Sequence, residues 1–108
     1  MNLVDRFLLW LEAERRYSPL TVRNYRHDID EFLGWMSLSR DSFVPQNIKR
    51  EDVEEWIIYL GETRKLKSTS VNRTVASLRT FWRWMLHHNH VERDIVSLIR
   101  SAKTPRRL

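Results

Sequence analysis

Apolar residues recur every three or four positions through most of this sequence, which is the spacing of one face of an α-helix. No run alternates apolar and polar residues with period two, and only two glycines occur, so strands are not expected. A chain of 108 residues is long enough for one compact domain and too short for two. The sequence therefore predicts an all-α domain, a bundle of four long helices with a short fifth helix.

Each expected helix has an apolar stripe and a recognisable start. Asn2, Ser18 and Asp94 precede the first, second and fifth helices as N-caps. Pro19 takes the first position of the second helix, where its missing N–H does no harm. The five stripes are Leu3, Phe7, Trp10 and Leu11; Val22, Tyr25, Ile29, Phe32, Leu33 and Met36; Val53, Trp56, Ile57 and Leu60; Val71, Val75, Leu78, Trp82 and Met85; and Ile95, Leu98, Ile99 and Ala102.

Residues 70–86, SVNRTVASLRTFWRWML, combine two characters in one expected helix. The second half carries Phe81 and Trp84 besides the main stripe, so it is predicted to be buried on several sides. The first half is predicted to project with a polar face, made of Asn72, Arg73, Ser77 and Thr80. The start of the second helix has a similar face, made of Thr21, Arg23, Asn24 and His27. Hydroxyl and amide side chains beside arginine bind phosphates and base edges, although a solvated face is the alternative for either helix alone.

The charge is unevenly distributed along the chain. Residues 1–67 carry eleven Lys or Arg against twelve Asp or Glu, a balance of −1, and residues 68–108 carry eight against two, a balance of +6. A basic C-terminal third suits a polyanion such as nucleic acid. The absence of cysteine excludes disulfides and thiolate metal sites, and FLLWL is far too short to span a membrane. We expect a cytoplasmic protein with no cofactor and no membrane partner.

Two further basic segments have alternative interpretations. In LHHNH, His87 and His90 are spaced as two arms of a metal site, but no third ligand follows, and imidazoles are ordinary at a helix C-terminus. We therefore expect no metal site. Lys103, Arg106 and Arg107 of the tail are candidates for contact with a DNA backbone, and equally for a solvated linker.

Two spaced patterns make the chain resemble a known family. The first is T-x-x-x-Y-x-x-D-[IL]-x-x-F, which begins at Thr21, and the second is N-R-x-x-x-x-L-R-x-F, which begins at Asn72. With REDVEEWIIYL between them and KTPRRL after them, the chain resembles, over nearly its whole length, the N-terminal core-binding domain of tyrosine recombinases, the phage integrase and Xer-type family. The resemblance implies a SAM-like helical bundle over residues 1–102, and residues 103–108 as the start of a linker.

In that family the domain forms one jaw of a clamp on duplex DNA, with its second and fourth helices at the major groove. The resemblance therefore implies DNA contacts for Thr21, Arg23, Asn24, Asn72, Arg73 and Ser77, and for His27 and Thr80 with less support. It implies three kinds of partner, namely duplex DNA, other recombinase protomers in a synaptic complex, and a catalytic domain of the same parent chain.

Two positions depart from the family pattern, Asp94-Ile95 where Asn-Pro is frequent and Lys49 where Thr or Ser is frequent. Both concern helix starts. The family's catalytic Arg, Lys, His and nucleophilic Tyr belong to a second domain that follows PRRL, so this chain is not expected to be an enzyme by itself. We expect it to be the DNA-binding part of a longer tyrosine recombinase.

A different class of function remains open in the sequence, a helical protein-interaction adaptor with a Trp-rich surface as its partner groove. Salt dependence separates the two, because phosphate contacts weaken with salt and an apolar groove is nearly indifferent to it. An ordinary helix-turn-helix regulator would need a short turn, and the connections over 37–46 and 62–67 are too long for one.

Overall fold

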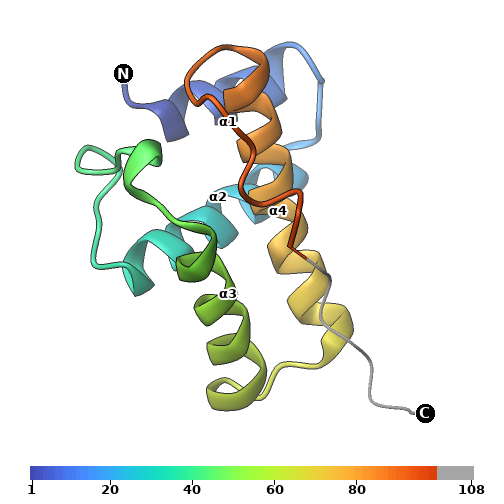
Figure 1. The fold of residues 1–108 in the computed structure, drawn as a ribbon. Coiled ribbons are helices and arrows are strands. Elements are labelled where there is room, and N and C mark those ends of the chain that lie inside the picture. Colours follow the sequence, from blue (N-terminus) through green and yellow to red (C-terminus); the bar gives the residue numbers. More distant parts are fainter. Residues whose placement is uncertain (100–108) are drawn as a thin grey trace. The chain divides into compact units, whose positions relative to one another are not determined.

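The structure is a computed structural model that describes residues 1–99 (Figure 1). These residues contain helices and no strand, which confirms the all-α prediction. The elements are α1 (Leu3–Ala13), α2 (Pro19–Trp35), the 3-10 turn η1 (Pro45–Asn47), α3 (Arg50–Ile58), the π-helical turn η2 (Tyr59–Thr63) and α4 (Ser68–His87). Two compact units, Met1–Pro45 and Gln46–Leu108, make up the chain. The expected boundary at residue 102 lies outside the described residues.

In the first unit α1 packs on α2. The buried residues of α1 are Val4, Phe7, Leu8 and Leu11. Of the expected stripe, Phe7 and Leu11 are buried, and Leu3 and Trp10 are half-buried. Trp10 lies at the edge of the core, where the Arg15 guanidinium carbon is 5.7 Å from its ring centroid.

The helix starts follow the predicted capping chemistry. Asn2 Oδ1 accepts the Asp5 N–H at 2.8 Å, and Ser18 Oγ accepts the Thr21 N–H at 3.2 Å, with Pro19 in the first turn of α2. Before α3 the Lys49 side chain cannot act as an acceptor. Asp52 instead accepts the Lys49 N–H at 2.9 Å, which is the reciprocal half of a capping box.

The helix ends share one motif that the sequence did not reveal. Each ends in a left-handed residue other than glycine, and the N–H of the following residue bonds a carbonyl five or six residues back; at the ends of α2 and α4 this is the five-residue bond of a Schellman motif. The left-handed residues are Arg16, Ser37, Lys65 and Asn89. The closing bonds are Tyr17 N–H to Leu11 O at 3.0 Å, Leu38 to Leu33 at 2.8 Å, Leu66 to Leu60 at 3.0 Å and His90 to Met85 at 2.8 Å. The chain thus makes four sharp exits with neither of its glycines.

The core of the second unit is organised by α4. Its predicted stripe, Val71 to Met85, is buried at every position, and Phe81 and Trp84 are buried as well, as predicted. After α4 the chain turns back along the helix (Figure 1), and the Arg79 Nη2 donates to the Ile99 carbonyl at 2.9 Å. Val91, Val96 and Ile99 of this return segment (residues 88–99) are buried.

The predicted fifth helix is not formed in the described residues. Asp94 does act as a cap, since its Oδ1 accepts the N–H groups of Val96 at 3.1 Å and Ser97 at 3.0 Å. Residues 95–98 form only a turn, which the Ile99 N–H to Val96 O bond of 3.0 Å closes. Ala102, the last member of the expected stripe, lies outside the described residues.

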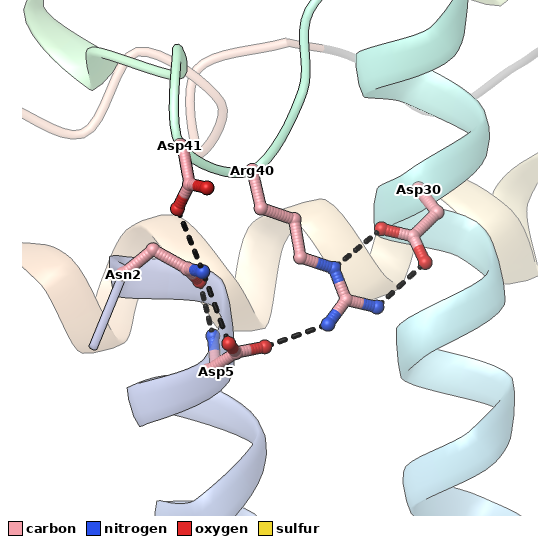
Figure 2. Close-up of polar contacts among 5 residues, drawn as sticks. All are labelled: Asn2, Asp5, Asp30, Arg40 and Asp41. Carbon is pink, nitrogen blue, oxygen red and sulfur yellow. Dashed lines mark hydrogen bonds and ion pairs between the residues drawn. The ribbon is translucent and has the colours of Figure 1, made fainter.

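Arg40, in the loop after α2, joins three segments of the first unit (Figure 2). Its Nε and Nη2 donate to the two carboxylate oxygens of Asp30 at 3.0 and 2.7 Å, and its Nη1 donates to Asp5 at 2.6 Å. Asn2 also donates to Asp5 at 3.0 Å and, more weakly, to Asp41 at 3.4 Å. The hydrogen bonds that Arg40 donates to Asp30, together with the charges of both aspartates, raise the pKa of Arg40 above its ordinary value. The guanidinium therefore stays charged while it fastens the loop to α1 and α2.

We expect Arg40→Met to lower the free energy of unfolding by about 1 kcal/mol in low salt, because the three side chains are 29–43 % exposed and water screens the ion pairs. The control is Arg50→Met, which breaks the exposed i,i+4 pair with Glu54 and should cost about 0.3 kcal/mol. Urea denaturation at low and high salt measures both. Equal losses for the two variants would show that Arg40 has no special role.

A second prediction concerns the left-handed Ser37 at the end of α2, whose φ is 62°. Ser37→Gly should raise the free energy of unfolding by about 0.5–1 kcal/mol, because a residue without Cβ adopts this conformation without strain. Ser37→Ala keeps the Cβ and should bring no gain. Thermal unfolding followed by circular dichroism compares the two, and a gain in both would assign the effect to the lost hydroxyl instead.

Candidate nucleic-acid interface

One face of α4 is open to solvent along the whole helix. Thr69, Arg73, Ala76 and Arg83 are exposed, and Thr80 is partly exposed. Their spacing of four, three, four and three residues places them on one side of a helix with 3.6 residues per turn. We call these five residues the α4 face. Asn72 borders it and is half-buried.

Ser77, predicted to lie on the uncovered face, is instead buried at 6 % exposed. It stands seven residues before Trp84, which is also 6 % exposed, so both residues point to the same side of α4. The sequence predicts that this side becomes buried only after Thr80, whereas the burial begins at Ser77. Thr74 is buried as well, and its Oγ1 lies 3.2 Å from Arg73 Nη2. Ser77 is therefore a packing residue in this structure.

The segment of the sequence that contains α4 carries basic residues and no acidic ones. Between Glu62 and Glu92 there are six Lys or Arg and no Asp or Glu. The exposed side of α3 and η2 has the opposite character, with Glu51, Glu55 and Glu62. Within the second unit, a polyanion would therefore be attracted to α4 and repelled from the exposed side of α3.

The N-terminal half of α2 exposes Arg23, Asn24 and His27, as predicted. Thr21 is half-buried, and its hydroxyl is 3.0 Å from Ser18 Oγ, so it also belongs to the helix cap. The sequence interpretation missed Arg26, which is exposed on the same half of α2. These residues belong to the first unit and the α4 face to the second, so the structure gathers each set on its own helix.

Arg79 and Arg83 of α4 were not among the predicted DNA contacts, and the structure gives them different roles. Arg79 is half-buried and holds the Ile99 carbonyl, so it serves the fold. Arg83 is exposed, one turn beyond Thr80 on the α4 face. The spacing from Arg73 could have found both Ala76 and Arg83, which follow it by three and ten residues on the same side of the helix.

The histidines after α4 pack as rings. His88 and His90 each have a centroid 5.2 Å from Trp84 and lie 6.5 Å from one another. Among residues 1–99 no group of three or more His, Cys, Asp or Glu side chains is placed to hold a metal ion. In the same range, no helix is both long and apolar enough for a membrane span. Lys103, Arg106 and Arg107, expected at the DNA backbone, lie outside the described residues.

Comparisons with known proteins agree on one family. Residues 4–89 match the family model described as "Phage integrase, N-terminal SAM-like domain". Tyrosine recombinase XerC of Pediococcus pentosaceus is 33 % identical over 103 residues, which are 95 % of this chain and 34 % of the relative. Tyrosine recombinase XerD of Listeria innocua is 29 % identical over 102 residues, 94 % of this chain and 34 % of the relative. The chain thus spans about a third of the length of these relatives. No solved structure matches it.

The contrast between Arg79 and Arg83 gives a prediction about stability. Arg79→Met removes the donor to the Ile99 carbonyl and should cost about 1.5–3 kcal/mol, the range for a hydrogen bond to a charged group. Arg83→Met makes the same charge change at an exposed position and should stay within about 0.5 kcal/mol of the parent protein. Urea denaturation measures the loss, and hydrogen exchange should quicken at the amides of Val96 and Ile99 in Arg79→Met only. Similar behaviour of the two variants would contradict this division.

Proposed function

Because the chain belongs to the phage integrase N-terminal SAM-like domain family, we propose that it is the DNA-binding domain of a tyrosine site-specific recombinase. It holds duplex DNA at the recombination site through the exposed faces of α2 and α4. The observation that carries the proposal is the α4 face, an arginine-bearing surface on a stretch of chain without acidic residues.

The α4 face has the residue types that a DNA contact requires. Arg73 and Arg83 can neutralise phosphates or donate to guanine, and Asn72 beside them can pair with adenine. The opposite side of the helix is fixed in the core by Leu78 and Trp82, which are 0 % and 1 % exposed. A helix anchored in this way presents its outer side chains in a fixed register, which base recognition needs.

On α2 the proposed contacts are Arg23, Asn24 and His27, with Thr21 at the helix start. The first turn of a helix directs its backbone N–H groups outward and attracts phosphate. Ser18 already accepts the Thr21 N–H, so the arginine and the amide, rather than that backbone group, are the proposed ligands of DNA.

The chemistry of recombination belongs, in this proposal, to a catalytic domain of the parent chain. The tyrosines of the first unit have structural surroundings instead. Tyr17 stacks on Tyr25 with 6.0 Å between centroids, and its hydroxyl accepts a hydrogen bond from Arg15 at 2.9 Å. The partners in this proposal are duplex DNA, that catalytic domain, and other protomers of the recombinase on the same DNA.

The competing prediction, a protein-interaction adaptor with a tryptophan-lined groove, receives little support. Trp56 and Trp82 are 1 % exposed and Trp84 is 6 % exposed, so these rings form core rather than a surface. A partner groove would need them accessible.

Binding to labelled duplex DNA, followed by fluorescence anisotropy at several salt concentrations, tests the proposal. We expect Arg73→Ala to raise the dissociation constant about tenfold at moderate salt and to lower the salt slope by about one if Arg73 meets a phosphate. Arg50→Ala is the matched control, because it makes the same charge change on α3 beside acidic residues and should change affinity by less than about twofold.

Equal weakening by the two substitutions would mean that net charge, and not the α4 face, drives binding. Binding that is absent even at low salt would overturn the proposal. Circular dichroism of both variants shows whether the helices are intact, because Arg73 is exposed and its removal is not expected to unfold the unit.

A further inference from the structure

We infer that the α4 face reads thymine methyl groups, with Ala76 and Thr80 as the specificity-determining residues. This inference rests on the proposed function, since it names what α4 recognises in the DNA. In the middle of the α4 face, between the exposed Arg73 and Arg83, two positions point outward. These positions, Ala76 and Thr80, offer methyl groups and no hydrogen-bond donor to DNA.

The hydrogen bond of Thr80 decides this chemistry. Its Oγ1 donates to the Ala76 carbonyl at 3.2 Å, so the hydroxyl proton is used within the helix. Guanine presents two acceptors, N7 and O6, in the major groove, and Thr80 cannot donate to either while this bond holds. What Thr80 offers is its methyl group and an oxygen acceptor. Ala76 offers only a methyl group.

Thymine is the base whose major-groove edge carries a methyl group. Opposite Ala76 and Thr80, the N7 and O6 acceptors of a guanine would lose water and gain no donor, whereas a thymine would bury its methyl against theirs. The oxygen of Thr80 can accept from the N6 amino group of adenine and equally from the N4 amino group of cytosine, so it does not discriminate between the two pairs. The buried thymine methyl and the unmatched acceptors of guanine both favour A·T over G·C at these positions.

The dimensions of the α4 face fit a short run of base pairs. At 1.5 Å per residue, Ala76 and Thr80 lie ~6 Å apart along the axis, and Arg73 and Arg83 ~15 Å apart. With a rise of ~3.4 Å per base pair, the arginines bracket about four base-pair steps. The methyl pair lies between them and so faces one or two neighbouring base pairs.

Small side chains on a helix can also admit a second helix at close range. The charge on this face argues against that occupant. Arg73 and Arg83 flank the methyl pair, and no acidic residue occurs between Glu62 and Glu92 to attract a basic partner. A phosphate backbone matches both arginines at once.

The experiment starts from a randomised DNA duplex library, from which this chain selects its preferred sequence. Copies of the selected duplex then have single thymines replaced by uracil, which removes only the 5-methyl group. At one or two positions the replacement should weaken binding about three- to fivefold, the loss expected for one buried methyl. Replacements elsewhere in the duplex are the internal control.

Variants assign the effect to residues. Thr80→Ser removes the side-chain methyl and should abolish the uracil effect at one position. Thr80→Val keeps a methyl and removes the hydroxyl, so it should retain the effect. Ala76→Gly should abolish the effect at the neighbouring position, with circular dichroism as a check because glycine weakens helices.

The outcomes separate the inference from the proposed function. Salt-sensitive binding without any selected sequence, or without a uracil effect, overturns the inference and leaves the proposed function intact. A uracil effect that persists in both Thr80→Ser and Ala76→Gly assigns the reading to another residue and also overturns it. No binding to any duplex overturns the proposed function itself.

Discussion

The burial of one side of α4 along its whole length is the constraint on which the second unit depends. Val71, Leu78 and Met85 occupy one side of the helix over four turns, and none is more than 2 % exposed. This fixes the rotation of the helix about its axis, so the side that remains open is determined as well. Arg79 adds a polar fastening by holding the Ile99 carbonyl and with it the return segment. The exposed arginines are therefore displayed by the same packing that stabilises the unit.

The apolar periodicity predicted buried residues well and exposed residues less well. It predicted every member of the α4 stripe, and the residue types at the helix starts predicted the caps at Asn2 and Ser18. It failed at Ser77, because a helix wheel gives the centre of the buried arc but not its width. The width depends on which neighbours cover the flanks, and that is tertiary information.

Other features were outside the reach of sequence patterns for related reasons. Arg40 pairs with Asp5 across 35 positions, and nothing in the local sequence selects that partner among other acidic residues. The left-handed helix ends use Arg, Ser, Lys and Asn where glycine would be the signal. In both cases the deciding interaction is specific to the folded chain. At the predicted fifth helix the Asp94 cap is present, but the described residues that follow it form only a turn.

Half of the fixed positions in the two patterns that carry the family resemblance are buried. Asp28, Ile29 and Phe32 of the first pattern are 1 % exposed or less, and so are Leu78 and Phe81 of the second. These positions specify the scaffold. The open residues Ala76, Thr80 and Arg83 stand between or beyond the pattern positions, where a substitution changes a surface and not the core. Substitutions at these three open positions can therefore alter the proposed DNA contacts while the buried scaffold stays intact.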